Sequence, residues 1–423
     1  MLKNNAYNKT MKFNKILLSL GLLLISLSSI YAQPASKVIA GISVDRLKSY
    51  DHFIQSEIDQ HKISGAVSLI MRNGVIVQNK VFGYKDVDNK VAMKTDDLFY
   101  IQSMTKPIIT VAFMMLFEEG HFLLTDPVSK YIPEFKNMRV IKNIEDGIHG
   151  ETEALKSEIT IAQLLSHSAG LTHGISGNKF DSEWIKEVYG KQWNNIKERT
   201  LSFTSLPMIG QPGKQWYYSA APDLLSTLIE KFSGKTTDEF LKERIFKPLG
   251  MSNTGYNLTE EQIARVVKVY NVESNGTLSL APRQPQSKGN KVWSGMNGLF
   301  STPEDYLKFC QMLMNNGSWK GKQYLSRKTI DIMTKNHVGD LYVKTNGDRQ
   351  GEGFGYGFAV IEDVAKTNQL GSNGLFYWSG AFNTHFFIDP KEKLISIFFT
   401  QSNPHDIYYH MKMRQFVYQA IVD

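Results

Sequence analysis

The sequence reads Phe-Tyr-Ile-Gln-Ser-Met-Thr-Lys-Pro at residues 99–107, and a largely apolar run continues to about residue 119. The hydroxyl of Ser103 needs a neighbouring base to act as a nucleophile at neutral pH. Positions three apart share one face of a helix, so we expect Lys106 beside Ser103, where a desolvated amine can take the proton. Pro107 suits a first helical turn, so the segment predicts Ser103 at a helix N-terminus, where free N–H groups can hold an oxyanion.

The pattern serine, two residues, lysine occurs a second time, at Ser176 and Lys179. That copy lies in a stretch rich in glycine and asparagine, which is typical of loops and does not hold two side chains on one helix face. The local context therefore favours Ser103 as the nucleophile.

A second candidate segment reads Gln-Pro-Gly-Lys-Gln-Trp-Tyr-Tyr-Ser-Ala at residues 211–220. A tyrosine can act as a phenolate base, or relay a proton to the leaving group, when a lysine lies nearby. The same residues also suit a loop whose aromatic rings pack on the next helix, and the segment alone leaves both interpretations open.

A third segment reads Tyr-Trp-Ser-Gly-Ala at residues 377–381, just before an apolar strand pattern. On an edge strand, Gly380 would let a substrate approach the backbone closely, and the N–H of Ala381 could donate to an oxyanion. A simple turn entering the strand would explain the same residues.

Strand patterns occupy both ends of the chain. Two apolar runs, 66–72 and 75–81, flank Asn73-Gly74, which is a strong hairpin signal, and two more runs follow at 384–388 and 394–400. The middle of the chain is mostly helical in pattern, and helices are also expected near 44–60 and 406–421. These patterns predict an α+β fold in which both chain ends form one antiparallel sheet flanked by helices, with a mostly helical insertion domain.

The first 32 residues resemble a secretory signal peptide. They contain four lysines and no acidic residue, then the apolar run 16–25, and a small-residue cleavage site after Ala32. The apolar run is shorter than the ~20 residues of a spanning helix, so we expect export to the periplasm or medium without a stable membrane span. Removing the four positive charges lowers the formal charge from +7 to +3, too little to favour nucleic-acid binding.

Other catalytic chemistries lack their sequence signals. The chain has no Gly-x-Ser-x-Gly, no His-Glu-x-x-His and no P-loop, and Cys310 is its single cysteine, expected to be buried in a helix. His167 and His173 are six residues apart on a glycine-broken segment, which is poor spacing for a metal, so both are predicted to be satisfied structural histidines. We therefore predict no metal and no cofactor.

The three segments occur in the order and approximate spacing of the serine β-lactamase-like family, which includes class C β-lactamases, D-Ala-D-Ala carboxypeptidases and family VIII carboxylesterases. The stretches 124–133, 164–171 and 298–305 also resemble landmarks of this family. The resemblance implies a β-lactamase/transpeptidase-like domain over residues 36–423. Its sheet would come from about 36–100 and 340–423, and its helical region from about 101–339.

The resemblance also implies roles for individual residues. Ser103 would be acylated, Lys106 would be its base or base partner, and Tyr218 would be the second-motif tyrosine. The N–H groups of Ser103 and Ala381 would hold the oxyanion, with Trp378 and Gly380 lining the substrate site. Which of Lys106 and Tyr218 is the base in each step stays open.

Two positions depart from the family pattern. Ala220 stands where asparagine is usual, and Trp378 stands where β-lactamases and peptidases carry a cation for the substrate carboxylate. The esterase branch tolerates tryptophan there, so we expect an exported serine esterase for small acyl esters. A β-lactamase, a D-Ala-D-Ala carboxypeptidase or other amide hydrolase, or a non-catalytic cell-wall or ligand-binding homologue are the alternatives. The physiological substrate, an ester, lactam or peptide, and the oligomeric state stay open.

Overall fold

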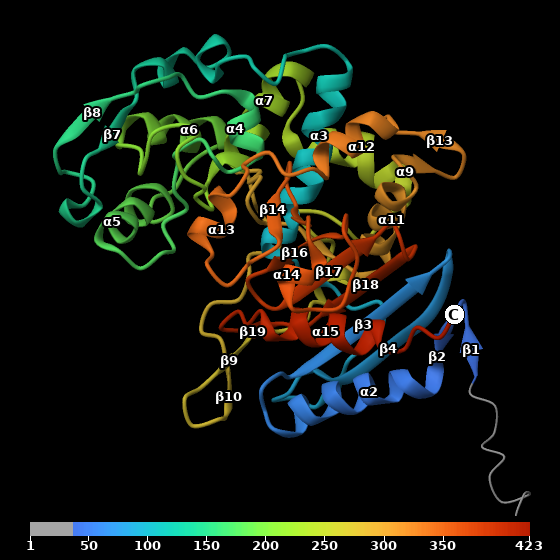
Figure 1. Ribbon diagram of the computed structural model, residues 1–423. Helices are drawn as coiled ribbons and strands as arrows, with labels where there is room; N and C mark the ends of the chain where they lie inside the picture. The colour runs from blue at the N-terminus through green and yellow to red at the C-terminus, as the bar shows by residue number, and fades with distance from the viewer. Residues whose placement is uncertain (1–36) are drawn as a thin grey trace, which may run out of the picture.

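A single eight-stranded antiparallel sheet organises the computed structural model, which describes residues 37–423 (Figure 1). Its strand order is β14-β15-β16-β17-β18-β3-β4-β5, so strands from the two ends of the chain share one sheet. The strands are β3 (Gly65–Arg72), β4 (Val75–Asp86), β5 (Val91–Ala92), β14 (Glu352–Phe354), β15 (Ala359–Ile361), β16 (Phe376–Gly380), β17 (Thr384–Asp389) and β18 (Leu394–Phe399). The predicted α+β architecture is confirmed.

The hairpin of β3 and β4 turns at Asn73 and Gly74, as predicted. Both residues have positive φ, 52° and 77°, which is the backbone of a type I′ turn and matches the twist of the paired strands. The C-terminal strand β18 then pairs with β3, with Ile397 opposite Leu69. This pairing joins the two chain ends into one sheet.

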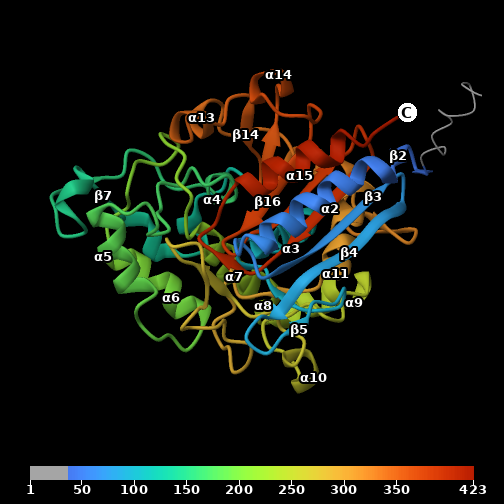
Figure 2. The same cartoon turned by 90° about the horizontal axis from the view of Figure 1, so that it is seen from below.

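Helices cover both faces of the sheet. Helices α2 (Val44–Asp59) and α15 (Tyr408–Tyr418) lie side by side across one face (Figure 2), and α11 (Pro303–Met314) packs on the other. Every residue of β3 is buried, because a central strand covered on both faces has no solvent-facing side. Cys310 of α11 is fully buried, as expected.

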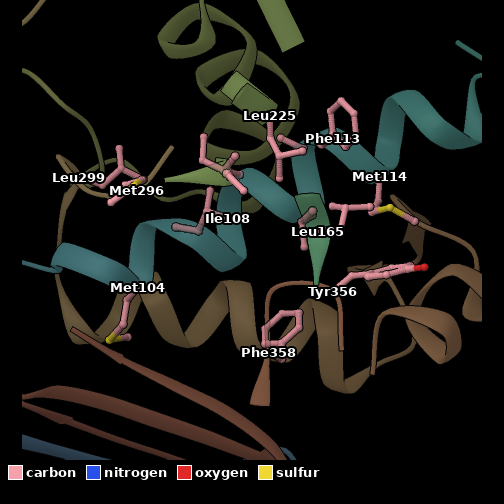
Figure 3. Close-up of a cluster of buried hydrophobic side chains, with 14 of the residues drawn as sticks. Met104, Ile108, Phe113, Met114, Leu165, Leu225, Met296, Leu299, Tyr356 and Phe358 are labelled. Atoms are coloured by element: carbon pink, nitrogen blue, oxygen red, sulfur yellow. The ribbon is translucent and has the colours of Figure 1, made fainter. Parts of the chain in front are cut away.

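Helix α3 (Thr105–Glu118) forms the centre of the helical region and packs closely against α7 (Ala221–Ser233). Residues 105–116 are all buried. Figure 3 shows why: Ile108 and Phe113 of α3 are surrounded by side chains from separate segments, among them Leu225 and Phe358. A helix enclosed in this way gives the residues at its start a rigid support.

The remaining elements are short. The helices are α4 (Ile161–Leu165), α5 (Lys179–Val188), α6 (Ile196–Ser202), α8 (Thr237–Leu241), α9 (Lys247–Leu249), α10 (Glu260–Ile263), α12 (Arg327–Met333), α13 (Leu341–Thr345) and α14 (Val364–Thr367). The strands are β1 (Val38–Ile39), β2 (Ile42–Ser43), β6 (Phe99–Tyr100), β7 (Arg139–Ile141), β8 (Thr152–Ala154), β9 (Tyr270–Val272), β10 (Leu278–Leu280), β11 (Phe300–Ser301), β12 (Ser318–Trp319), β13 (Lys322–Gln323) and β19 (Ser402–Asn403).

The predicted signal peptide, residues 1–32, lies outside the described residues. Within residues 37–423, no helix has the length and apolar character needed to cross a bilayer.

Candidate active site

Ser103 lies in a 3₁₀ turn, Gln102–Met104, that runs directly into α3. The sequence predicts the serine at the start of a helix, and the structure differs only in tightening this first turn. Gln102 has a φ of 48°, a left-handed conformation that is costly for a residue with a side chain. A backbone hydrogen bond fixes the residue before this turn, since the N–H of Ile101 donates to the carbonyl of Leu299 at 3.0 Å.

Lys106 lies beside Ser103, one turn further along. Its Nζ is 3.0 Å from Ser103 Oγ and 2.9 Å from the carbonyl oxygen of Met296, and its side chain is almost completely buried. Burial lowers the pKa of Lys106 from 10.5 to about 7, and the negative charge of Asp223 opposes this shift by a smaller amount. An amine with this pKa is neutral in a large fraction of molecules at physiological pH, as a general base must be.

A backbone carbonyl accepts the second hydrogen bond of Lys106. Ala220 is fully buried and has no polar side chain to offer Lys106, whereas the Met296 carbonyl oxygen lies 2.9 Å from Lys106 Nζ. That carbonyl is positioned by Asp223, which accepts hydrogen bonds from Ser294 Oγ at 2.7 Å and from the N–H of Met296 at 3.3 Å. The sequence contains no pattern that identifies this arrangement.

Tyr218, and not Tyr217, joins the serine–lysine pair. Lys106 Nζ lies 4.5 Å from the centre of the Tyr218 ring, whereas the Tyr217 hydroxyl donates to Gln215. Burial raises the pKa of the Tyr218 phenol, and the nearby side chains of Ser103 and Trp378 lower it by a smaller amount. The phenol is therefore protonated at neutral pH and can donate or relay a proton.

Strand β16 brings the third segment to the same place. Its residues Phe376 and Tyr377 pair with β15, but Trp378, Ser379 and Gly380 pair only with β17. The sequence predicts an edge strand here. The structure shows an inner strand whose last three residues form a local edge, because β15 pairs only as far as Tyr377.

Glycine is required at position 380 by the closeness of this edge to the nucleophile segment. A Cβ atom there would overlap the carbonyl of Ile101 and the hydroxyl of Thr384. Ala381 lies beyond the strand, in the tight turn between β16 and β17, in which the N–H of Asn383 donates to the carbonyl of Gly380 at 3.0 Å. The backbone of residues 380–381 thus comes close to the start of α3.

Trp378 packs between the second segment and the sheet. The centre of its ring system lies 5.4 Å from that of Tyr218 and 5.3 Å from that of Phe354. It supplies an apolar surface beside Tyr218.

All the predicted site residues except the buried Lys106 line one cavity of about 430 Å³. Its walls come from the three predicted segments and from loops that the sequence does not connect with them. The lining residues are Gln102, Ser103, His173, Ile175, Trp216, Tyr218, Asn297, Tyr342, Asn346, Arg349, Tyr377, Trp378, Ser379, Gly380, Ala381, His405 and Ile407. The predicted site did not include Asn297, Asn346, Arg349 and His405, which reach the cavity from loops. Asn297 directly precedes the family-like stretch 298–305, and the other three have no motif around them.

The two histidines discussed above have different environments. His167 is structural, as predicted: its Nδ1 accepts a hydrogen bond from the N–H of Ser219 at 3.1 Å. For His173 the prediction is wrong, since its Nδ1 has no partner among residues 37–423 and its ring stacks on Tyr218 at 5.2 Å, inside the cavity. Burial lowers the pKa of both imidazoles, so His173 faces the cavity as a neutral group. Residues 37–423 contain no group of three or more His, Cys, Asp or Glu side chains that could hold a metal ion.

Comparison with known proteins gives a family match over most of the chain. A family model described as Beta-lactamase matches residues 50–415. The uncharacterized protein MT1414 of Mycobacterium tuberculosis is 30% identical over 361 residues, which cover 83% of this chain and 89% of the relative. Esterase EstB of Burkholderia gladioli is 26% identical over 358 residues, 80% and 86% of the two chains. The solved structure of EstCE1, a hydrolase with promiscuous acyltransferase activity, has a TM-score of 0.75 at 24% identity and covers 88% of this chain and 99% of its own, a likeness of fold.

Proposed function

The chain is a serine hydrolase that belongs to the Beta-lactamase family, and we propose that it cleaves carboxylic esters of small acyl groups through an acyl-enzyme on Ser103. The observation that carries this proposal is the buried amine of Lys106, 3.0 Å from Ser103 Oγ with a pKa of about 7. Without such a base, a serine hydroxyl is unreactive toward an ester at neutral pH.

In the acylation half-reaction, neutral Lys106 takes the proton of Ser103 as Oγ attacks the ester carbonyl carbon. The negative charge that develops on the carbonyl oxygen is held by the N–H groups of Ser103 and Ala381, which are preorganised donors on a rigid backbone. Collapse of the tetrahedral intermediate expels the alcohol, which receives its proton from Lys106 directly or through the Tyr218 hydroxyl.

In the deacylation half-reaction, a water molecule attacks the acyl carbon, and Lys106 with Tyr218 removes its proton. The Lys106 amine lies over the Tyr218 ring, 4.5 Å from its centre, so the two groups can act on the same water molecule. Release of the carboxylic acid regenerates the Ser103 hydroxyl.

Three observations favour esters over lactams and peptides. Ala220 cannot hydrogen-bond a substrate amide, Trp378 presents an indole where a carboxylate-binding cation is usual, and aromatic rings line much of the cavity. Among the relatives, EstB of Burkholderia gladioli and the lovastatin esterase of Penicillium rubens carry esterase names.

The test compares wild-type protein with Ser103→Ala on p-nitrophenyl esters from acetyl to octanoyl and on a chromogenic cephalosporin. Ser176→Ala is the matched control, because it removes the serine of the second Ser-x-x-Lys pattern, outside the cavity. We expect ester turnover that is abolished by Ser103→Ala and retained by Ser176→Ala. Faster turnover of the cephalosporin than of every ester would refute the ester preference. Absence of turnover and of fluorophosphonate labelling would refute the hydrolase mechanism.

We also propose that the protein is exported and cleaved after Ala32, on the evidence of the N-terminal sequence pattern. N-terminal sequencing of the protein from the periplasmic fraction should then begin at Gln33. Retention of the segment 1–32 on protein from the cytoplasm would contradict this proposal.

A further inference from the structure

One charged side chain distinguishes the cavity. Among its lining residues, all within the described part of the chain, Arg349 is the single lysine or arginine, and no aspartate or glutamate accompanies it. Arg349 lies in the loop between α13 and β14, and 17% of its side chain is exposed. A cation in a largely apolar cavity attracts an anion strongly, because the surrounding walls screen little of its field.

The contacts of Arg349 leave much of its guanidinium available. Nη1 donates to the Tyr377 hydroxyl at 3.4 Å and lies 3.9 Å from Glu352, whose other oxygen accepts from Tyr377 at 2.5 Å. Its contact with Asp348 is also 3.9 Å long, and the Asp348 side chain is 81% exposed. All of these are weaker than a direct arginine–carboxylate pair, which forms two hydrogen bonds of about 2.8 Å.

The nearest buried carboxyl group, that of Glu352, is shared between several partners. Glu352 faces the positive charges of both Arg349 and Arg414, and burial raises the pKa of its carboxyl group. Glu352 thus interacts with two guanidinium groups and accepts a hydrogen bond from Tyr377, so it is not an exclusive partner of Arg349.

Aromatic side chains connect Arg349 with the nucleophile. The ring of Tyr218, which lines the cavity together with Ser103, stacks on Trp216 at 6.2 Å, and Trp216 contacts the ring of Tyr342 at 4.8 Å. Tyr342 belongs to α13, the helix that leads into the Arg349 loop. Ser103 and Arg349 therefore line the same cavity, and the aromatic side chains of Tyr218, Trp216 and Tyr342 form an apolar wall between them.

We propose that the natural substrates are anionic esters, in which a carboxylate binds to Arg349 while Ser103 attacks an ester carbonyl separated from it by an apolar segment. This inference rests on the proposed esterase function and narrows its substrate class. Arg349 does not occupy the third-motif position, where Trp378 stands. The proposed anion-binding group therefore lies in the loop between α13 and β14, and not on β16.

The test uses two pairs of substrates matched in shape and different in charge. On the acyl side, mono-p-nitrophenyl adipate is compared with p-nitrophenyl hexanoate. On the alcohol side, (4-acetoxyphenyl)acetate is compared with 4-ethylphenyl acetate by pH-stat titration. The quantity measured is the ratio of kcat/KM for the anionic ester to that for the neutral ester in each pair.

Arg349→Met should lower this ratio by about 10- to 100-fold in at least one pair, which is the usual effect of losing a charged hydrogen bond. Arg327→Met is the matched control, since Arg327 lies on α12 with a side chain 60% exposed and should leave both ratios unchanged. An unchanged ratio in Arg349→Met for both pairs would overturn the proposal. So would a wild-type enzyme that prefers the neutral ester in both pairs.

A binding measurement separates this proposal from the esterase proposal. Monomethyl adipate is titrated into Ser103→Ala protein and into the double variant Ser103→Ala/Arg349→Met, and binding is measured by calorimetry. Both proteins lack the nucleophile, so the measurement does not depend on catalytic activity. The anion site is supported if Ser103→Ala protein binds monomethyl adipate and the double variant binds it at least tenfold more weakly. This result supports the site even if the enzyme hydrolyses no ester. Equal affinity for both proteins, or no binding to either, would overturn it. If Arg349→Met unfolds the chain, the substitution Glu352→Gln is added to it. Glutamine removes the buried carboxyl charge that Arg349 would otherwise leave behind, and its side-chain oxygen still accepts the hydrogen bond from Tyr377.

Discussion

Replacing Lys106 by methionine should change the free energy of unfolding by an amount that depends on pH, because only the wild type has a titrating group at this buried position. Methionine has nearly the same length as lysine and no charge, so it fills the same buried space. In the folded protein the pKa of Lys106 is about 7, whereas in the unfolded chain the ordinary value of 10.5 applies. At a pH between 7 and 10.5, Lys106 carries a proton in the unfolded chain but not in the folded protein. The wild-type protein therefore gains stability as the pH rises through this range.

The magnitude follows from the two pKa values. Keeping Lys106 buried lowers the free energy of unfolding of the wild type by about 4 kcal/mol at pH 7 and by about 1 kcal/mol at pH 10. The Lys106→Met variant has no such dependence at this position. The difference in unfolding free energy, variant minus wild type, should therefore fall by about 3 kcal/mol between pH 7 and pH 10.

Urea unfolding of both proteins at pH 7, 8, 9 and 10 measures this difference. The hydrogen bonds that Lys106 makes to Ser103 and Met296 are lost in the variant at every pH, so they cancel when the two pH values are compared. Burial lowers the pKa of His167 and His173, and Lys106 lowers both values by a smaller amount, so both imidazoles stay neutral in the folded proteins from pH 7 to pH 10. A difference that stays constant within 1 kcal/mol from pH 7 to pH 10 would refute the lowered pKa of Lys106, and with it the argument for a neutral base.

Three further predictions concern the same site. For a neutral ester, kcat/KM should rise about tenfold from pH 6 to pH 8 and then level off, since Lys106 loses its proton near pH 7; a tenfold rise per pH unit that continues to pH 10 would contradict this. Tyr218→Phe keeps the ring that contacts Lys106 and Trp378 but removes the hydroxyl, and it should lower kcat by roughly 10²- to 10³-fold in steady-state assays, while a loss of less than about threefold would exclude Tyr218 from proton transfer. Gly380→Ala places a Cβ against the carbonyl of Ile101, so calorimetry should show a loss of about 1–3 kcal/mol in unfolding free energy, and an unchanged Tm would argue against the close approach.

The features that could be predicted from the sequence are those with a local physical cause. The type I′ turn at Asn73 and Gly74 depends on two residues that tolerate positive φ, and the side-by-side placement of Ser103 and Lys106 depends on helical spacing. The antiparallel sheet shared by the two chain ends followed from the apolar strand patterns at those ends.

The environment of these residues was decided by tertiary structure alone. The carbonyl of Met296 and the guanidinium of Arg349 are brought to the site by loops nearly 200 and 250 residues after the nucleophile, and His173 is placed against Tyr218 by the same packing. No spacing rule connects such loops, because their meeting depends on how separate layers of the fold bury their apolar faces. The sequence therefore determined that Ser103 has a lysine beside it. Only the folded structure decided that this lysine is buried enough to act as a base and that the positive charge of Arg349 lines the same cavity.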